Sequence, residues 1–174
     1  MDYPNTVFRT AIRQVAGQWL ATGLPSQQVL DEAAESLKQL RDRLAIRGLW
    51  QSPPCMVTAT LDDGLGQGLA VIEAFAEAIG MQLIALGPMQ PPETIVAVCD
   101  RQQPDYLGLT ILQFDSEEDL AWIANKLAGR TRIVAGGPVF QADPDFARRT
   151  GTHYAAKNVA DFLWFMTTAA CGGR

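Results

Sequence analysis

Histidine is nearly absent from this sequence, and cysteine is scarce. The chain has one histidine, His153, and three cysteines, Cys55, Cys99 and Cys171. The cysteines are odd in number and lack the spacing of a metal site, so we interpret them as reduced thiols of a cytoplasmic protein. No Gly-x-Ser-x-Gly motif is present, which argues against a hydrolase. We interpret His153 as a surface residue or one with a structural partner.

Long apolar runs and an excess of bases are also missing. The 174 residues include 14 Lys and Arg against 19 Asp and Glu, a net charge of −5. An acidic chain has no general field that attracts phosphate backbones, so direct nucleic-acid binding is not expected. No apolar stretch is long enough to cross a membrane, and the N-terminus has no signal-peptide pattern.

The N-terminal third has the pattern of a helical hairpin. Apolar residues recur at helical spacing over residues 5–22, and a second helix follows Ser26 with leucines in coiled-coil-like steps. A two-helix hairpin buries too little apolar surface to be stable alone. We therefore expect it to pack on the rest of the chain or to form a homodimer through these helices.

Two prolines at positions 53 and 54 separate this hairpin from the rest of the chain, because they cannot continue a helix. We predict an N-terminal helical segment over residues 1–50 and an α/β domain over residues 55–174. Hydrophobic residues make up 48% of the chain, which is enough for a sizeable core.

Strand and helix patterns alternate in this second part. Apolar runs predict five strands, at residues 55–61, 82–87, 106–112, 131–135 and 152–155. Buried strands alternating with helices are typical of a parallel sheet covered on both faces. We therefore predict an α/β fold, a flavodoxin-like (Rossmann-like) five-stranded parallel sheet.

The loop after the first strand is the first candidate site. The run from Cys55 ends in Asp62 and Asp63 and continues into a glycine-rich turn with Gly64 and Gly66. Ligands of open α/β sheets bind outside the carboxyl ends of the strands. We therefore expect the ligand near these four residues and near the loops that follow the other strands.

Two familiar ligand sites fit this loop poorly. A dinucleotide fingerprint needs a third glycine, where the chain has Leu69, and two carboxylates would repel a pyrophosphate. A phospho-receiver domain needs an aspartate at the end of the third strand, and the run from Tyr106 to Leu112 has none. A nucleotide ligand remains a minor alternative.

Three later stretches point to a known family by their order and spacing. They are Leu86-Gly87 with Pro91-Pro92-Glu93, then Pro104 to Thr110, then Ile133 to Pro138. From Met56 to about Val159 the chain resembles the cobalamin-binding domain family. That family includes corrinoid methyl-carrier proteins, the cobalamin modules of methionine synthase and the mutases, and cobalamin-dependent photoreceptor regulators.

The resemblance implies three cofactor motifs. The second motif, Ser-x-Leu, lines the slot for the cofactor's nucleotide tail and becomes Thr110-Ile111-Leu112, which keeps a hydroxyl. The third, Gly-Gly, lets that tail come close and is intact as Gly136-Gly137. The implied tail-slot residues are therefore Thr110, Leu112, Gly136 and Gly137.

The first motif, Asp-x-His-x-x-Gly, is altered. It aligns with residues 61–66, which keeps Gly66 but puts Asp63 in the place of the cobalt-binding histidine and Leu61 in the place of its aspartate partner. A carboxylate is a harder ligand than an imidazole, and the partner that orients the imidazole is missing as well. The resemblance with this departure implies cobalamin bound without a protein histidine.

Three functions follow from that departure. The one we favour is a sensor or regulatory module that binds a corrinoid, or a related tetrapyrrole such as haem, and signals to a protein partner. In family members of this kind a helical module covers the cofactor's upper face, where Trp19 or Trp50 could serve; ordinary core packing is the alternative for both.

The second function is a corrinoid methyl carrier that works with a methyltransferase. The third is a protein-interaction module that has lost its cofactor. No acid–base pair stands out, so a binding module is expected rather than an enzyme.

Overall fold

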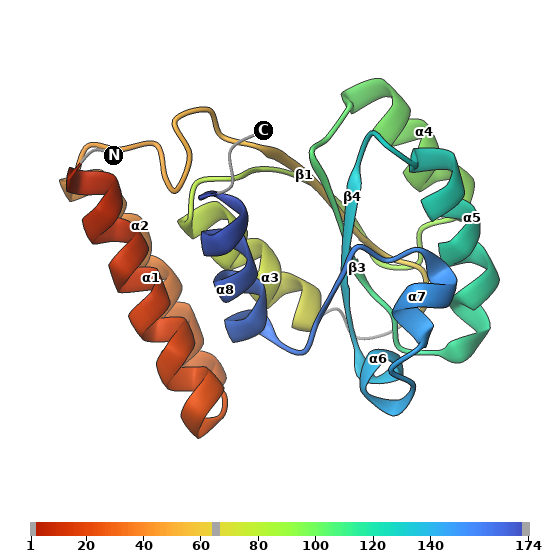
Figure 1. Cartoon of the computed structure of the whole chain (residues 1–174), viewed down its shortest axis with the longest axis horizontal. Coiled ribbons are helices and arrows are strands. Elements are labelled where there is room, and N and C mark those ends of the chain that lie inside the picture. Colours follow the sequence, from red (N-terminus) through yellow and green to blue (C-terminus); the bar gives the residue numbers. More distant parts are fainter. Residues whose placement is uncertain (1–2, 64–66, 172–174) are drawn as a thin grey trace. The chain divides into compact units, whose positions relative to one another are not determined.

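The computed structural model describes residues 3–63 and 67–171. Strands and helices alternate in it from residue 55 onward, as predicted (Figure 1). The strands are β1 (Cys55–Thr60), β2 (Gln82–Gly87), β3 (Tyr106–Thr110), β4 (Arg132–Gly136) and β5 (Tyr154–Ala156). The helices are α1 (Tyr3–Thr22), α2 (Gln27–Arg43), α3 (Gln67–Ala78), α4 (Pro92–Gln102), η1 (Phe114–Ser116), α5 (Glu117–Leu127), α6 (Pro138–Ala142), α7 (Phe146–Thr150) and α8 (Val159–Ala169).

The five strands form one parallel sheet in the order β2-β1-β3-β4-β5, which confirms the predicted flavodoxin-like fold. The chain moves to one side of β1 to form β2 and to the other side to form β3. β1 and β3 are therefore neighbours at the point where the strand order reverses. Open α/β sheets bind ligands at this switch point, outside the carboxyl ends of the strands.

One face of the sheet is an aliphatic core. The odd-numbered strand residues, such as Val57, Leu109 and Ile133, are buried in one cluster with apolar residues of α4 and α5. These two helices lie next to each other on that face (Figure 1). Because side chains alternate along a strand, the even-numbered residues of the same strands point to the opposite face.

The chain divides into two compact units, each described here by itself. The helical unit comprises the described residues among 1–53, 71–82 and 158–174, and the sheet unit comprises those among 54–70 and 83–157. The helical unit therefore combines α1 and α2 with α8 and most of α3. The boundary predicted between residues 50 and 55 stays a prediction.

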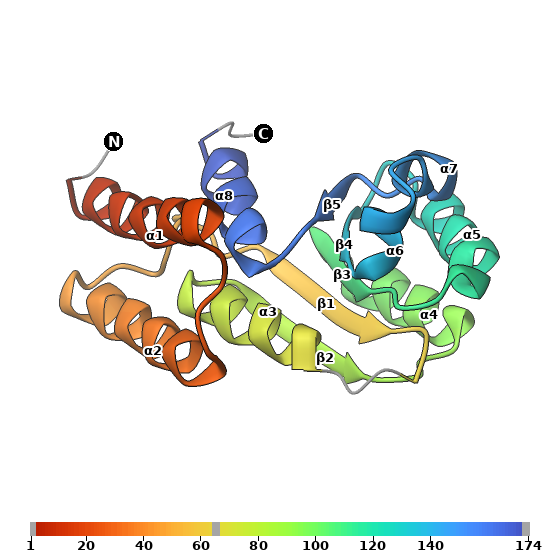
Figure 2. The ribbon, with the colours of Figure 1, turned by 90° about the horizontal axis from the view of Figure 1, so that it is seen from below.

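In the helical unit, α1 and α2 lie side by side (Figure 2). The buried face of α1 consists of Phe8, Ile12, Ala16 and Trp19. α1 also packs on α8, where Arg13 Nε donates to Thr167 Oγ1 at 3.3 Å. The first of the two predicted ways to bury this hairpin, packing within the chain, is therefore realised, and the homodimer remains a prediction.

Two bases of α2 bind the end of α3. Arg41 donates to the backbone carbonyl of Glu77 at 2.6 Å, and Lys38 pairs with the Glu77 carboxylate at 3.1 Å. The last carbonyls of a helix have no partner within the helix, and cations there also favour its dipole. Arg41 and Lys38 thus complete the C-terminus of α3.

Candidate functional site

The residues that end three adjacent strands lie in one row across the sheet. Thr60 of β1 is opposite Thr110 of β3, and Thr110 is opposite Gly136 of β4. All three are even-numbered and so belong to the face opposite α4 and α5. The sheet thus brings together the predicted residues Thr110 and Gly136 and adds Thr60, which the sequence did not single out.

Small side chains line this face near the row. Thr58 and Thr60 are buried, Thr110 is half-buried, and Gly108 has no side chain. The Thr110 hydroxyl has no hydrogen-bond partner among the described residues and is available to a ligand. Further from the edge, a Cβ on Gly108 would lie 2.3 Å from Met56 Cε, so the Met56 side chain packs over Gly108. At the carboxyl end of this face, Thr110 and Gly136 are half-buried, whereas Gly108 is buried.

Thr60 connects the loops that follow β1 and β2. Its hydroxyl donates to the Asp62 carbonyl at 2.9 Å and accepts from the Met89 amide at 3.1 Å. Its carbonyl accepts from the Gln90 amide at 2.8 Å. These bonds hold both loops against the end of β1.

Asp62 connects the same strand end to the loop after β3. Its carboxylate Oδ2 accepts from the backbone amides of Leu112 at 2.8 Å and Gln113 at 3.3 Å. The residue is buried, with 9% of its surface exposed, and its other oxygen, Oδ1, has no partner among the described residues. The sequence analysis named Asp62 but assigned the cofactor-binding role to Asp63. It could not detect the bonds of Asp62, because the donating amides lie 50 and 51 positions further along the chain.

The residue predicted to replace histidine, Asp63, is exposed at the end of this loop. Gly64 and Gly66, the two other residues predicted in the loop, lie outside the described residues. The roles assigned to these three residues from the family motif therefore stay predictions. Leu112 is half-buried, and its amide is one of the donors to Asp62.

The Gly136-Gly137 pair makes a close contact within the protein. The Gly136 carbonyl accepts from the Ile111 amide at 2.9 Å. Gly137 has φ +125°, and a Cβ there would lie 2.0 Å from the Ile111 carbonyl oxygen. Gly137 is therefore required where the chain segments just after β3 and β4 meet, whether or not a ligand also approaches it.

His153 lies toward the amino end of the sheet. It precedes β5 beside Ile133, and its Nδ1 accepts from the Ile133 amide at 3.0 Å. This bond agrees with the structural interpretation of His153. The chain's one imidazole is thus engaged away from the row formed by Thr60, Thr110 and Gly136.

The loops after β3 and β4 are joined by aromatic rings and one arginine. The buried Phe146 ring of α7 meets Phe114 and Phe140 edge to face, at centroid distances of 5.7 and 5.3 Å. Arg149 lies 5.8 Å from the centre of the Phe146 ring. Short helices that the sequence had assigned to loops, η1 and α6, supply Phe114 and Phe140.

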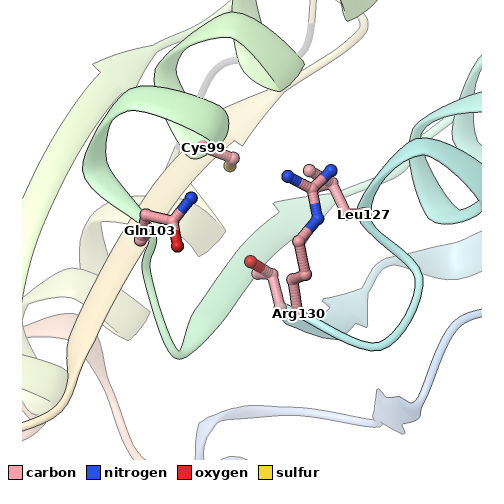
Figure 3. Close-up of a pocket in the computed structure, with 5 residues that line it drawn as sticks. Cys99, Gln103, Leu127 and Arg130 are labelled. Atoms are coloured by element: carbon pink, nitrogen blue, oxygen red, sulfur yellow. The ribbon is translucent and has the colours of Figure 1, made fainter.

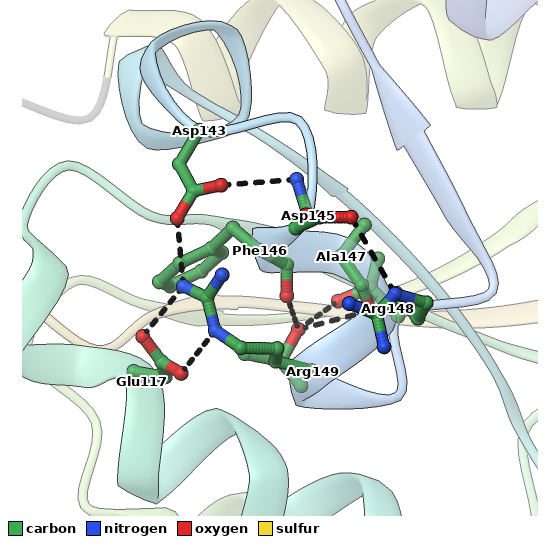
Figure 4. A network of polar contacts seen from close by, with 9 residues as sticks. Glu117, Asp143, Asp145, Phe146, Ala147, Arg148 and Arg149 are labelled. Atoms are coloured by element: carbon green, nitrogen blue, oxygen red, sulfur yellow. Dashed lines mark hydrogen bonds and ion pairs between the residues drawn. The ribbon is translucent and has the colours of Figure 1, made fainter.

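Arg149 also pairs with two carboxylates (Figure 4). It donates to Glu117 through Nε at 2.8 Å and Nη2 at 3.1 Å, and to Asp143 through Nη2 at 2.7 Å. Hydrogen bonds from Arg149 lower the pKa of Glu117 and of Asp143. The bidentate geometry makes this pair more specific than an ordinary surface ion pair.

Replacing Arg149 is expected to give a pH-dependent loss of stability. Arg149→Gln should lower Tm at pH 7 by about 2 °C, since exposed ion pairs contribute little. Carboxylates with lowered pKa stabilise the fold above their ordinary pKa, and this is lost as pH falls through the lowered value. The difference in Tm should therefore disappear between about pH 5 and pH 2. Arg148→Gln is the control, because the exposed Arg148 only reaches Asp145, at 3.5 Å; a constant difference across pH would contradict the prediction.

A small cavity lies at the other end of the strands (Figure 3). It holds about 30 Å³, room for one water molecule, and lies between the C-terminal ends of α4 and α5. It is lined by Cys99, Gln103, Leu127, Arg130 and Thr131. Burial raises the pKa of the Cys99 thiol to about 12, so this cysteine is unreactive at neutral pH.

Residues 3–63 and 67–171 were searched for metal-binding groups and for membrane-spanning helices. No group of three or more His, Cys, Asp or Glu side chains is placed there to hold a metal ion. None of the helices in the described ranges has both the length and the apolar character needed to cross a membrane.

The sheet order defines a flavodoxin-like protein, and the row of strand ends is its candidate ligand site. The family model of the B12 binding domain matches residues 54–160. The chain therefore belongs to the B12 binding domain family, as the resemblance of its motifs indicated. No curated protein matches the sequence.

Solved structures with the same fold include corrinoid proteins. A cobalamin-binding protein from Desulfitobacterium hafniense DCB-2 has TM-score 0.78 and 21% identity, over 94% of this chain and 80% of that one. The monomethylamine corrinoid protein of Methanosarcina barkeri has TM-score 0.60 and 14% identity, over 90% of this chain and 78% of that one. A chain of the methanol:cobalamin methyltransferase complex of the same organism has TM-score 0.64 and 16% identity, over 98% of this chain and 69% of that one.

Proposed function

We propose that this chain binds a corrinoid at the carboxyl edge of its sheet without a protein histidine beneath the cobalt, and that it is a sensor or regulatory module acting on a protein partner. The observation that carries this proposal is the position of His153. The one imidazole of the chain binds the Ile133 amide, toward the amino end of the sheet. Methyl-group chemistry that depends on a histidine ligand is therefore disfavoured.

The residues of the row are chemically suited to such a ligand. A corrinoid supplies a cobalt centre in a ring rich in primary amides, joined to a nucleotide tail. The free Thr110 hydroxyl and the free Oδ1 of Asp62 offer polar partners beside a surface of small residues. In the alternative base-off complex, a tail that extends further along this face would have to displace the end of Met56, which an unbranched thioether allows.

The test is a titration with hydroxocobalamin, methylcobalamin and adenosylcobalamin, followed by absorbance and calorimetry, with haem as the comparison. We expect micromolar or tighter corrinoid binding and a base-on spectrum, because no protein imidazole displaces the cofactor's own base. A base-off spectrum would instead point to Asp63 or water beneath the cobalt. A folded chain that binds haem alone would be a haem sensor, and one that binds neither would support the cofactor-free interaction module.

A methyl carrier is the second candidate. Its support is that the likeness to the methanol:cobalamin methyltransferase complex covers 98% of this chain, the N-terminal helices included. With a methyltransferase encoded beside its gene and a thiol acceptor added, a carrier should lose the methyl group of bound methylcobalamin to the thiol and leave the cobalt in the +1 state, whereas a sensor should retain the methyl group. The absorbance of the bound cofactor distinguishes the two.

Replacing Thr110 tests the tail slot. Thr110→Val keeps the shape of the side chain but removes the hydroxyl, so it should weaken cobalamin binding by about 5–10-fold, the usual range for one hydrogen bond. The affinity for cobinamide, which lacks the tail, should stay unchanged. Equal losses for the two ligands would place Thr110 beside the ring instead, and no loss for either would remove it from the site.

A further inference from the structure

Asp62 has one carboxylate oxygen bonded and the other without a partner. Oδ2 accepts from the amides of Leu112 and Gln113, while Oδ1 is buried and unpartnered among the described residues. A carboxylate can accept about four hydrogen bonds. A buried oxygen with no donor is costly, so we expect a donor other than the described residues to complete this position.

The position of Asp62 is fixed by the strand ends. Its carbonyl accepts from the Thr60 hydroxyl at 2.9 Å, and Thr60 is the β1 member of the row. Its side chain is bound to the loop that follows Thr110, the β3 member. Asp62 therefore lies at the switch point between β1 and β3, where a ligand of this fold is expected.

The missing donor fits an amide better than a metal ion. A cation would need several oxygen ligands, and no cluster of three or more acidic, His or Cys side chains exists among residues 3–63 and 67–171. One buried acceptor needs only one N–H group. Primary amides of the corrin ring supply such groups.

We infer that Asp62, rather than Asp63, is the polar anchor of the loop after β1, and that its Oδ1 accepts a hydrogen bond from a corrinoid amide. This inference rests on the proposed function. Asp63 is exposed, with no bond to another described residue. The two neighbouring aspartates thus differ in role because only Asp62 is held by the strand ends.

The experiment compares Asp62→Asn with Asp63→Asn. Asparagine at position 62 keeps one oxygen for the amides of Leu112 and Gln113 but puts an NH2 donor where Oδ1 was. Asp62→Asn should weaken the binding of hydroxocobalamin and of cobinamide by roughly 10–100-fold, as expected for a lost bond to a charged acceptor. In the base-on complex that we propose, Asp63 does not lie beneath the cobalt, so Asp63→Asn, which removes the same charge one residue away, should change the Kd of hydroxocobalamin by no more than about twofold.

The outcomes separate this inference from the proposed function. A wild-type chain that binds no corrinoid overturns both. A wild-type chain that binds, with Asp62→Asn binding equally well, overturns the inference alone. Equal losses in the two variants also overturn it, because the effect would then come from charge and not from the position of Asp62.

A measurement on the wild-type chain covers the case in which Asp62→Asn does not fold. Aspartate labelled with ¹³C at the carboxyl carbon gives each side chain its own NMR signal. Addition of hydroxocobalamin should shift the Asp62 signal and leave that of Asp63 in place. An unshifted Asp62 signal in the bound protein overturns the inference.

Discussion

Gly137→Ala is expected to lower the free energy of unfolding by about 3–5 kcal/mol, combining backbone strain with overpacking. The added Cβ would lie 2.0 Å from the carbonyl oxygen of Ile111 and 2.9 Å from its carbonyl carbon. These are backbone atoms at the end of β3, so they cannot swing aside as the end of a flexible side chain can. The φ of +125° adds strain, because L-residues rarely adopt it.

Urea unfolding measures this effect, and Gly87→Ala is the matched control. Gly87 is the last residue of β2 and has φ +86°, but a Cβ there would meet nothing within 4 Å. It should cost only about 1 kcal/mol for the unfavourable φ. Similar losses in the two variants would show that the contact with Ile111 is unimportant.

The expected instability changes the interpretation of the Gly136-Gly137 motif in this chain. The motif suggested a bare backbone that lets a nucleotide tail approach. Gly137, however, already has a necessary contact inside the protein. Lost cobalamin binding in a Gly137 variant is therefore no evidence of a tail contact, whereas Thr110→Val alters only a side chain at the same edge.

Local patterns were sufficient to predict the fold. Apolar runs located all five strands to within two residues at each end. The pattern is strongest in β1 and β3, which are buried along nearly their whole length. The alternation with helices then determined the parallel sheet. The helices η1 and α6 were missed because each is shorter than two turns and begins within a loop rich in turn-forming residues.

The candidate site was predicted only in part, and the reason is sequence distance. Strand ends gather at one edge in any parallel sheet, so the meeting of Thr110 with Gly136 followed from topology. The bond from Leu112 to Asp62 spans 50 positions and has no local pattern. From the sequence alone, Asp62 and Asp63 are two adjacent acids, and only the folded loop distinguishes the buried one from the exposed one.

The sequence also did not predict which helices pack together. Phe75 of α3 is buried, and its ring meets Trp19 of α1 edge to face at 5.7 Å. Helical periodicity predicts which residues of a helix are buried, but it does not predict which distant residues they contact. The sequence predicted correctly that α1 has an apolar face but could not name its partner.

Trp19→Ala is expected to lower the free energy of unfolding by about 3–5 kcal/mol, the usual loss for a buried aromatic side chain. Trp19 is 6% exposed, and the Phe75 ring lies edge to face with it at an angle of 85°. Trp19 had two interpretations, a cover for the cofactor's upper face or part of the core, and this packing favours the core. The corrinoid affinity of the folded variant should therefore equal that of the wild type.

Thermal and urea unfolding together with a hydroxocobalamin titration decide between these interpretations. Trp164→Ala is the control: Trp164 is 43% exposed and lies 5.7 Å from the Arg13 guanidinium, so its truncation should cost less, about 1–2 kcal/mol. Trp19→Phe retains an aromatic ring against Phe75 and should fall between the two in stability. A Trp19→Ala variant with wild-type stability and weakened corrinoid binding would reverse the conclusion, because it would move Trp19 from the core of the helical unit to the ligand.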